Sequence, residues 1–136
     1  MRAILILLAL LLCACTNPRR DSVVGAPPFS VDAAAFALTE ELSHHGLHVR
    51  GVSADAYELF WESDYSGDAA PSPRGEQIWI GNTLTYREIL TISEVQAHTL
   101  GWMLEIAARG GKVRLWLDDR DSALRVKAAL LRLKQE

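Results

Sequence analysis

The chain has 136 residues and a formal net charge of −3 at pH 7, from 14 basic and 17 acidic side chains. This length suits one small domain with a single modest core. The acidic balance excludes the positive surface that nucleic-acid binding needs, and the glycines form neither a dinucleotide-binding nor a phosphate-loop motif. We therefore expect neither a nucleic-acid partner nor a cofactor.

The first residues have the three parts of an export signal. Met1 and Arg2 form a short basic start, residues 3–12 are an unbroken apolar run (AILILLALLL), and the small residue Ala14 follows. The apolar run is too short to cross a bilayer, which takes about 20 residues. The pattern therefore predicts a signal peptide over residues 1–14.

Both cysteines of the chain, Cys13 and Cys15, come directly after this apolar run. The stretch LCAC resembles the lipobox of bacterial lipoproteins, with aliphatic Leu12 three places before Cys15 and small Ala14 just before it. The resemblance implies that Cys15 is the first residue of the mature protein and that it carries lipid chains, among them palmitate. Thr16 stands where inner-membrane lipoproteins carry aspartate, which implies the periplasmic face of the outer membrane. The alternative is a plain cleaved secretory signal.

The segment that follows the lipobox has the composition of a linker. Residues 15–29 contain three prolines, one glycine and mixed polar residues, so we expect a lipidated N-terminus and a flexible linker there. Residues 30–136 then form a single periplasmic domain. Removal of residues 1–14 would take away one basic residue, Arg2, leaving 13 basic against 17 acidic residues and a net charge of −4.

Hydrophobic periodicity predicts the elements of this domain. In chain order it predicts a helix over 31–45, strands over 47–53, 57–62 and 76–81, a strand or a helix over 83–90 with the strand favoured, a helix over 94–109, a strand over 112–118 and a helix over 120–135. The passage over 84–117 could form a parallel crossover. The expected fold is α+β, with a mixed, largely antiparallel sheet of four or five strands and about three helices packed on it.

Three aromatic side chains oppose the apolar faces of their predicted strands. If helices cover only one side of the sheet, Phe60, Trp79 and Trp116 form an exposed strip on the other side, with Arg114 beside it. Aromatic residues and arginine are enriched at protein interfaces, so these four residues are the predicted partner-binding site. The alternative is that a helix covers this face too.

Two polar clusters and one further histidine have the residue types of a metal-binding or catalytic site. His44 and His48 could hold a metal, and Asp118 and Asp119 could hold a metal or exchange protons. His98 could act as a general base, but no nucleophile can be paired with it. We favour structural roles for all five, with the histidines near a helix C-terminus and the aspartates near a helix N-terminus. No metal site is therefore expected.

These features favour a protein that is not an enzyme. We expect an outer-membrane lipoprotein whose small periplasmic domain binds a protein partner, as an accessory or assembly factor of an envelope or secretion complex. Pilot lipoproteins of secretion systems are similar in size and layout, although no motif in this domain carries the resemblance. The alternative is a small periplasmic enzyme or metal- or ligand-binding lipoprotein that uses His44 and His48, or Asp118 and Asp119.

The lipid anchor can be tested with two substitutions. Cys15→Ser should abolish incorporation of labelled palmitate into the protein, because it removes the thiol that the lipobox presents for modification. Cys13→Ser should leave labelling intact, because that residue is removed with the signal peptide. Labelling that survives Cys15→Ser and disappears in Cys13→Ser would move the anchor to Cys13.

Overall fold

A computed structural model describes residues 30–65 and 79–134. The predictions made for the signal peptide, for Cys15, for the linker and for most of the segment 63–75 lie outside these residues, as does the first half of the strand expected over 76–81. Neither of the two helices in the described part of the chain is long and apolar enough to cross a membrane.

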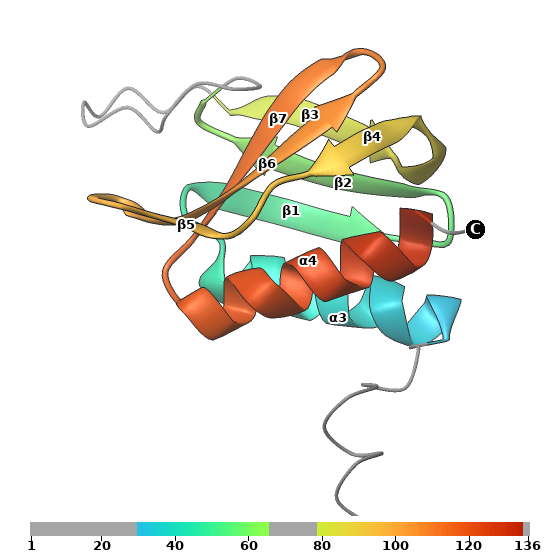
Figure 1. Cartoon of the computed structure of the whole chain (residues 1–136), viewed down its shortest axis with the longest axis horizontal. Helices are drawn as coiled ribbons and strands as arrows, with labels where there is room; N and C mark the ends of the chain where they lie inside the picture. The colour runs from blue at the N-terminus through green and yellow to red at the C-terminus, as the bar shows by residue number, and fades with distance from the viewer. Residues whose placement is uncertain (1–29, 66–78, 135–136) are drawn as a thin grey trace, which may run out of the picture.

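The described residues form an α+β fold in which two helices pack with two small antiparallel sheets, which confirms the predicted fold class (Figure 1). In chain order the elements are α3 (Val31–His45), β1 (Val49–Ala54), β2 (Glu58–Ser63), β3 (Ile80–Thr85), the 3-10 turn η1 (Tyr86–Glu88), β4 (Ile89–Ile92), β5 (Gln96–His98), β6 (Gly101–Ala108), β7 (Gly111–Leu117) and α4 (Arg120–Lys134).

The two sheets are both built from consecutive antiparallel strands. The first has the order β1-β2-β3, and in the second β6 pairs with β4, β5 and β7. Strand β7 pairs with residues 102–108 of β6. Strands β4 and β5 therefore both pair with the other edge of β6. Strands β6 and β7 run across the first sheet in Figure 1, and buried side chains from both sheets and both helices form one core. The parallel crossover expected over 84–117 is therefore wrong, since every strand pair in this passage is antiparallel.

Helix α3 has the bounds that the sequence predicts. The hydroxyl of Ser30 accepts a hydrogen bond from the backbone N–H of Ala33 at 3.1 Å, which satisfies one free donor of the first turn. Ala35, Leu38 and Leu42 are buried at helical spacing. The N-cap and the apolar stripe are both local features, and they set this helix without help from distant residues.

Helix α4 also forms where the sequence predicts it. It has two adjacent apolar stripes and buries only one of them. Val126, Leu130 and Leu133 are buried, whereas Leu124 and Leu131 of the adjacent stripe are 37% and 41% exposed. Two adjacent apolar stripes on one helix satisfy the same spacing rule. Only the position of the sheet beneath the helix decides which of them is covered.

The two helices lie side by side and run in opposite directions (Figure 1). The start of α3 and the end of α4 meet at one end, where Val31 and Leu133 line a common pocket. At the other end the backbone N–H of Asp118 donates to the carbonyl of His45 at 3.0 Å. The helix pair therefore has one end at Val31 and Leu133 and another at His45 and Asp118.

The helix predicted over 94–109 is wrong, because this segment forms β5 and β6. Apolar residues that recur at helical spacing in this segment also alternate, and Leu104 and Ile106 are buried on one side of β6. The pairing of β6 with β7 along its length satisfies the backbone groups of both strands, which favours the strand. The decisive signal is Gly110, since Arg109 and Gly110 form a two-residue hairpin loop between two apolar runs.

The strand favoured over 83–90 is interrupted by a corner. Strand β3 ends at Thr85, and η1 turns the chain before β4 begins at Ile89. Tyr86 anchors this corner, because its side chain is buried and its backbone N–H donates to the carbonyl of Tyr57 at 3.0 Å. The corner passes the chain from the first sheet to the second.

Gly101 lies where β6 and the end of β7 meet Leu47 of the segment before β1, and its replacement tests this packing. Its φ is +144°, and an added Cβ would lie 2.5 Å from the carbonyl oxygen of Leu117 and 2.8 Å from the side chain of Leu47. Backbone strain and overpacking each cost about 1–3 kcal/mol, so Gly101→Ala should lower the free energy of unfolding in urea by about 2–4 kcal/mol. Gly110→Ala is the control, with no atom within 4 Å of the added Cβ, and should change it by about 0.5 kcal/mol or less. Equal effects of the two substitutions would show that space at Gly101 is not limiting.

Candidate functional site

The exposed aromatic strip predicted from the sequence does not form. Trp116 is only 3% exposed and lies in a small second core with Tyr65, Met103 and Leu47. The ring of His98 meets it edge-on, with ring centroids 5.2 Å apart. The alternation was correct, since Trp116 points away from its core-facing neighbours, but the expected exposure was wrong.

A backbone contact from outside the sheet explains this burial. The N–H of Leu47 donates to the carbonyl of Trp116 at 2.8 Å, and Gly46 forms an isolated bridge with Leu117. These contacts draw the segment between α3 and β1 along the end of β7, so that the side chain of Leu47 covers the indole. No helix is needed to cover this side of the sheet.

The other predicted partner-binding residues lie on two different sheets. Phe60 is 37% exposed, and its ring lies against Gly81 of the neighbouring strand. The guanidinium of Arg50 lies 4.3 Å from the centre of the Trp79 ring. Arg114 lies on the second sheet, where its Nε donates to Glu105 at 3.1 Å. The structure thus separates Phe60 and Trp79 from Trp116 and Arg114, and the ring faces of the first two already have intramolecular contacts.

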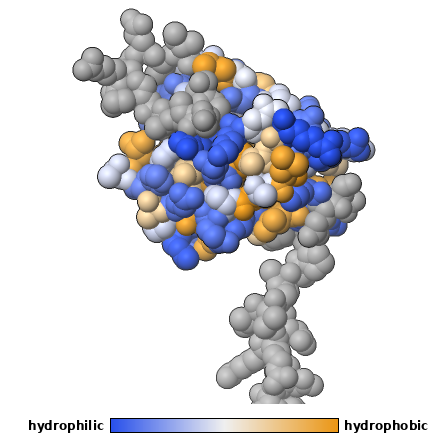
Figure 2. Space-filling view, turned by 45° about the horizontal axis from the view of Figure 1, so that its top comes forward, coloured by the Kyte–Doolittle hydropathy of each residue, from blue (hydrophilic) through white to orange (hydrophobic). Residues whose placement is uncertain are grey.

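Hydropathy over the surface agrees with this separation. On the face seen in Figure 2, hydrophobic and hydrophilic residues are interspersed and do not gather into one broad apolar area. An interface on that face would have little contiguous apolar area to bury.

The histidines pair with separate carboxylates. His44 Nε2 lies 3.2 Å from Glu40, and His48 Nδ1 lies 2.6 Å from Oδ2 of Asp64. The structure therefore does not bring His44 and His48 together on a common ligand. Within residues 30–65 and 79–134, no group of three or more His, Cys, Asp or Glu side chains could hold a metal ion.

The two aspartates at the start of α4 also have different partners. Asp118 lies 2.9 Å from Nδ1 of His45. Asp119 accepts hydrogen bonds from the backbone and the hydroxyl of Ser122 at 3.3 and 3.1 Å, as a helix cap does. Desolvation raises the pKa of the Asp119 carboxyl, but the hydrogen bonds from Ser122 outweigh it and the net pKa is below the ordinary value. The arrangement fits the structural role favoured from the sequence.

The described residue cluster with the greatest aromatic exposure lies at the opposite end of the helices. Phe36 of α3 and Tyr57, in the turn between β1 and β2, are 67% and 75% exposed. Tyr57 is the first residue of the strand expected over 57–62, but β2 begins at Glu58. Asp55 accounts for this, because its Oδ1 accepts the backbone N–H groups of Tyr57 and Glu58, both at 2.8 Å, and turns the chain before β2 begins. An aspartate whose side chain accepts the backbone N–H two residues further on is a known turn signal and could have located this turn.

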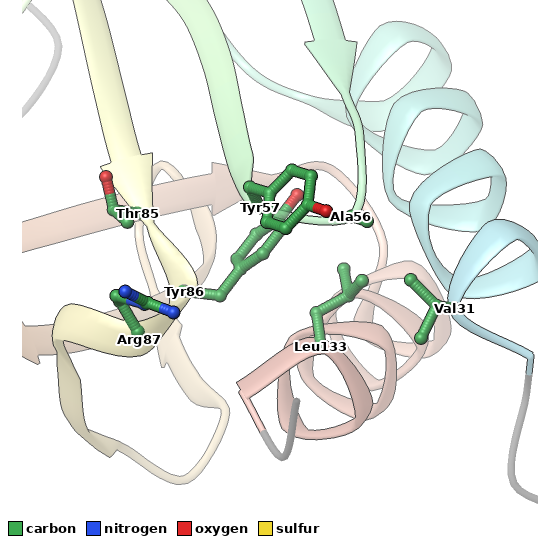
Figure 3. A pocket seen from close by; sticks show the side chains of 7 residues that line it. All are labelled: Val31, Ala56, Tyr57, Thr85, Tyr86, Arg87 and Leu133. Atoms are coloured by element: carbon green, nitrogen blue, oxygen red, sulfur yellow. The ribbon is translucent and has the colours of Figure 1, made fainter.

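Two hollows flank Tyr57 and share Ala56. The smaller, of about 210 Å³, lies between the β1–β2 turn, η1 and the facing ends of the two helices (Figure 3). The larger, of about 540 Å³, lies between α3 and the β1–β2 turn, and we call it the α3 groove. Its described lining residues are Asp32, Ala35, Phe36, Thr39, Glu40, Ala54, Asp55, Ala56 and Tyr57.

The walls of the two hollows differ in charge. The α3 groove has three carboxylates and no basic residue in its described lining. Hydrogen bonds from the N–H groups of Tyr57 and Glu58 hold the pKa of Asp55 below its ordinary value, so this carboxyl stays ionised. The smaller hollow has the cation of Arg87, which forms no ion pair with a described residue. Its floor is Tyr86, whose pKa is raised by burial and by the nearby Asp55 and Glu58.

The linings of the two hollows are apolar, aromatic and charged. Their described linings contain no histidine, cysteine or serine that could serve as a nucleophile or as a base near neutral pH. They combine exposed rings, apolar walls and fixed charges, which is the composition of a recognition surface. Comparisons of this chain with protein-family models, with curated proteins and with solved structures find no match.

The burial of Trp116 predicts how its substitutions behave. Trp116→Ala should lower the free energy of unfolding in urea by about 3–5 kcal/mol, because it opens a cavity in the second core. Trp116→Phe keeps most of the ring and removes an indole N–H that has no partner among the described residues, so the change should be about 1.5 kcal/mol or less. A change in Trp116→Ala as small as that in Trp116→Phe would indicate an exposed indole.

Proposed function

We propose that this protein is an outer-membrane lipoprotein whose folded domain binds a protein partner in the periplasm, as an accessory or assembly factor of an envelope or secretion complex. The sequence around Cys15 supports the anchor. The surface around Phe36 and Tyr57, where the two hollows meet, supports the binding role.

The observation that carries this proposal is the exposure of two aromatic side chains on one groove. Phe36 and Tyr57 are the two most exposed large hydrophobic side chains of the described residues, and both line the α3 groove. Leaving such rings in water forgoes about 1.5–3 kcal/mol of burial each, which a bound partner would recover. Buried aromatic anchors contribute much of the binding energy of protein interfaces.

The position of this surface also suits a tethered protein. Val31 and Asp32, at the start of α3, line the two hollows. The segment that leads back to Cys15 joins the domain at Ser30, directly beside them. Residues 16–29 can span at most about 50 Å when fully extended, so the segment that joins the anchor to Ser30 has about that reach.

The enzymatic alternative has less support from the geometry. It rested on His44 with His48 and on Asp118 with Asp119. Each of these four side chains contacts a different internal partner in the structure, and neither pair converges on a shared point. The proposal therefore places function on the aromatic surface.

The proposed interface can be tested by crosslinking in the cells that produce the protein. A photoreactive phenylalanine analogue at Tyr57 should give one discrete adduct with a partner. Phe36→Ala should reduce its yield strongly, because loss of an interface anchor costs about 2 kcal/mol, or roughly 30-fold in affinity. Phe36 is exposed, so this substitution should leave the fold intact.

Phe60 is the matched control, since it is an aromatic residue on a sheet surface away from both hollows. The photoreactive analogue at Phe60 should give no adduct, and Phe60→Ala should leave the Tyr57 adduct unchanged. An adduct from Phe60 alone would move the interface to the outer face of the first sheet. If neither position gives an adduct, the proposed function is contradicted.

A further inference from the structure

We propose that the α3 groove recognises a positively charged segment of the partner, with a lysine or arginine side chain laid across the rings of Phe36 and Tyr57. This inference rests on the proposed function, and it names the chemistry of the partner that the groove accepts. Three features of the groove support it: its charge, the state of its carboxylates and its aromatic walls.

The charge of the α3 groove has one sign. Asp32 and Glu40 of α3 face Asp55 of the β1–β2 turn across the groove, and no basic side chain is among the described lining residues. His44 lies 3.2 Å from Glu40 on this wall, and Arg87 lines the smaller hollow, which also contains Tyr57. An anionic segment would meet three carboxylates here, whereas a cationic segment would be attracted by them.

Part of this charge is not used inside the molecule. Asp32 is exposed in the first turn of α3 and forms no ion pair with a described residue. Glu40 contacts only an exposed histidine, with 47% of its own side chain accessible. By contrast, Glu41 on the same helix is bound by Arg125 at 2.5 Å and is 17% exposed. Asp32 and the exposed part of Glu40 thus remain available to a ligand, whereas Asp55 also caps its own turn.

The aromatic walls suit the same ligand. A guanidinium or ammonium group over an exposed aromatic ring gains attraction from the ring face, and its alkyl stem covers the apolar surface. This domain already contains one such contact, between Arg50 and Trp79. The smaller hollow beyond Tyr57 has apolar walls from Val31 and Leu133, and it can receive a neighbouring apolar side chain of the same segment (Figure 3).

The test uses the full mature chain without its lipid, carrying Cys15→Ser, and two short blocked peptides. The peptides share the same leucines and tryptophans, and one carries lysines where the other carries glutamates. Addition of the lysine peptide should shift the backbone amide signals of groove residues, Phe36, Thr39, Ala54 and Tyr57 among them. The glutamate peptide should shift them far less, and added salt should weaken binding of the lysine peptide.

Two helix N-termini supply a matched pair of variants. Asp32→Asn and Asp121→Asn each remove one acid from the first turn of a 15-residue helix, but only Asp32 lines the groove. Asp32→Asn should weaken binding of the lysine peptide about 2- to 5-fold, and Asp121→Asn should leave it unchanged. Equal effects of the two variants would indicate attraction to net charge alone and would overturn the inference.

The outcomes separate this inference from the proposed function. If the lysine and glutamate peptides bind alike while the crosslinked adduct through Tyr57 persists in cells, the groove is an interface of another chemistry and only this inference fails. If the groove signals respond to neither peptide and no adduct forms, both fail. Selective binding of the lysine peptide with loss in Asp32→Asn supports both.

Discussion

The fold depends on one junction, where the chain between α3 and β1 pairs with the end of β7. Gly46 bridges to Leu117, and the N–H of Leu47 donates to the carbonyl of Trp116 at 2.8 Å. Only glycine fits at 46, since an added Cβ would collide with the carbonyl of Leu42, and Gly101 is confined from the other side by Leu117 and Leu47. These contacts join residues about 70 positions apart, and they hold α3, β1, β7 and the start of α4 at one end of the domain.

The junction explains why the two ends of the domain differ. Close to it, polar side chains contact each other in pairs, as in His45 with Asp118 and His48 with Asp64, and the indole of Trp116 is covered. Such internal pairs rigidify the end of the domain where α3, β1, β7 and the start of α4 meet. About 22 Å along α3, the opposite end has two exposed rings, and the carboxylate of Asp32 forms no ion pair with a described residue. At this open end, Phe36, Tyr57 and Asp32 stay exposed to solvent.

Local features of the sequence were enough to predict part of this architecture. The N-cap Ser30 and the stripe through Leu38 and Leu42 specify α3, and the acidic start and apolar face specify α4. The segment 94–109 could not be assigned in the same way, because its apolar residues satisfy both the helical and the strand period. Pairing with β7 decides between them, and pairing is a property of two segments together. Strand alternation likewise predicted the side to which Trp116 points, but its burial depends on Leu47, almost 70 residues away.

The same contrast accounts for the functional surface. Sequence reasoning sought aromatic residues that oppose an apolar strand face, and it found Phe60 and Trp79, whose rings have partners within the first sheet. The exposed pair, Phe36 and Tyr57, belongs to a helix and to a turn, so no single periodicity relates them. They become neighbours because the turn that Asp55 caps packs beside α3. The exposed rings of Phe36 and Tyr57 are not part of the core. Helix α3 contributes Leu38 and Leu42 to the core, and both are fully buried. The proposed partner would contact both rings and the unpaired carboxylate of Asp32 beside them.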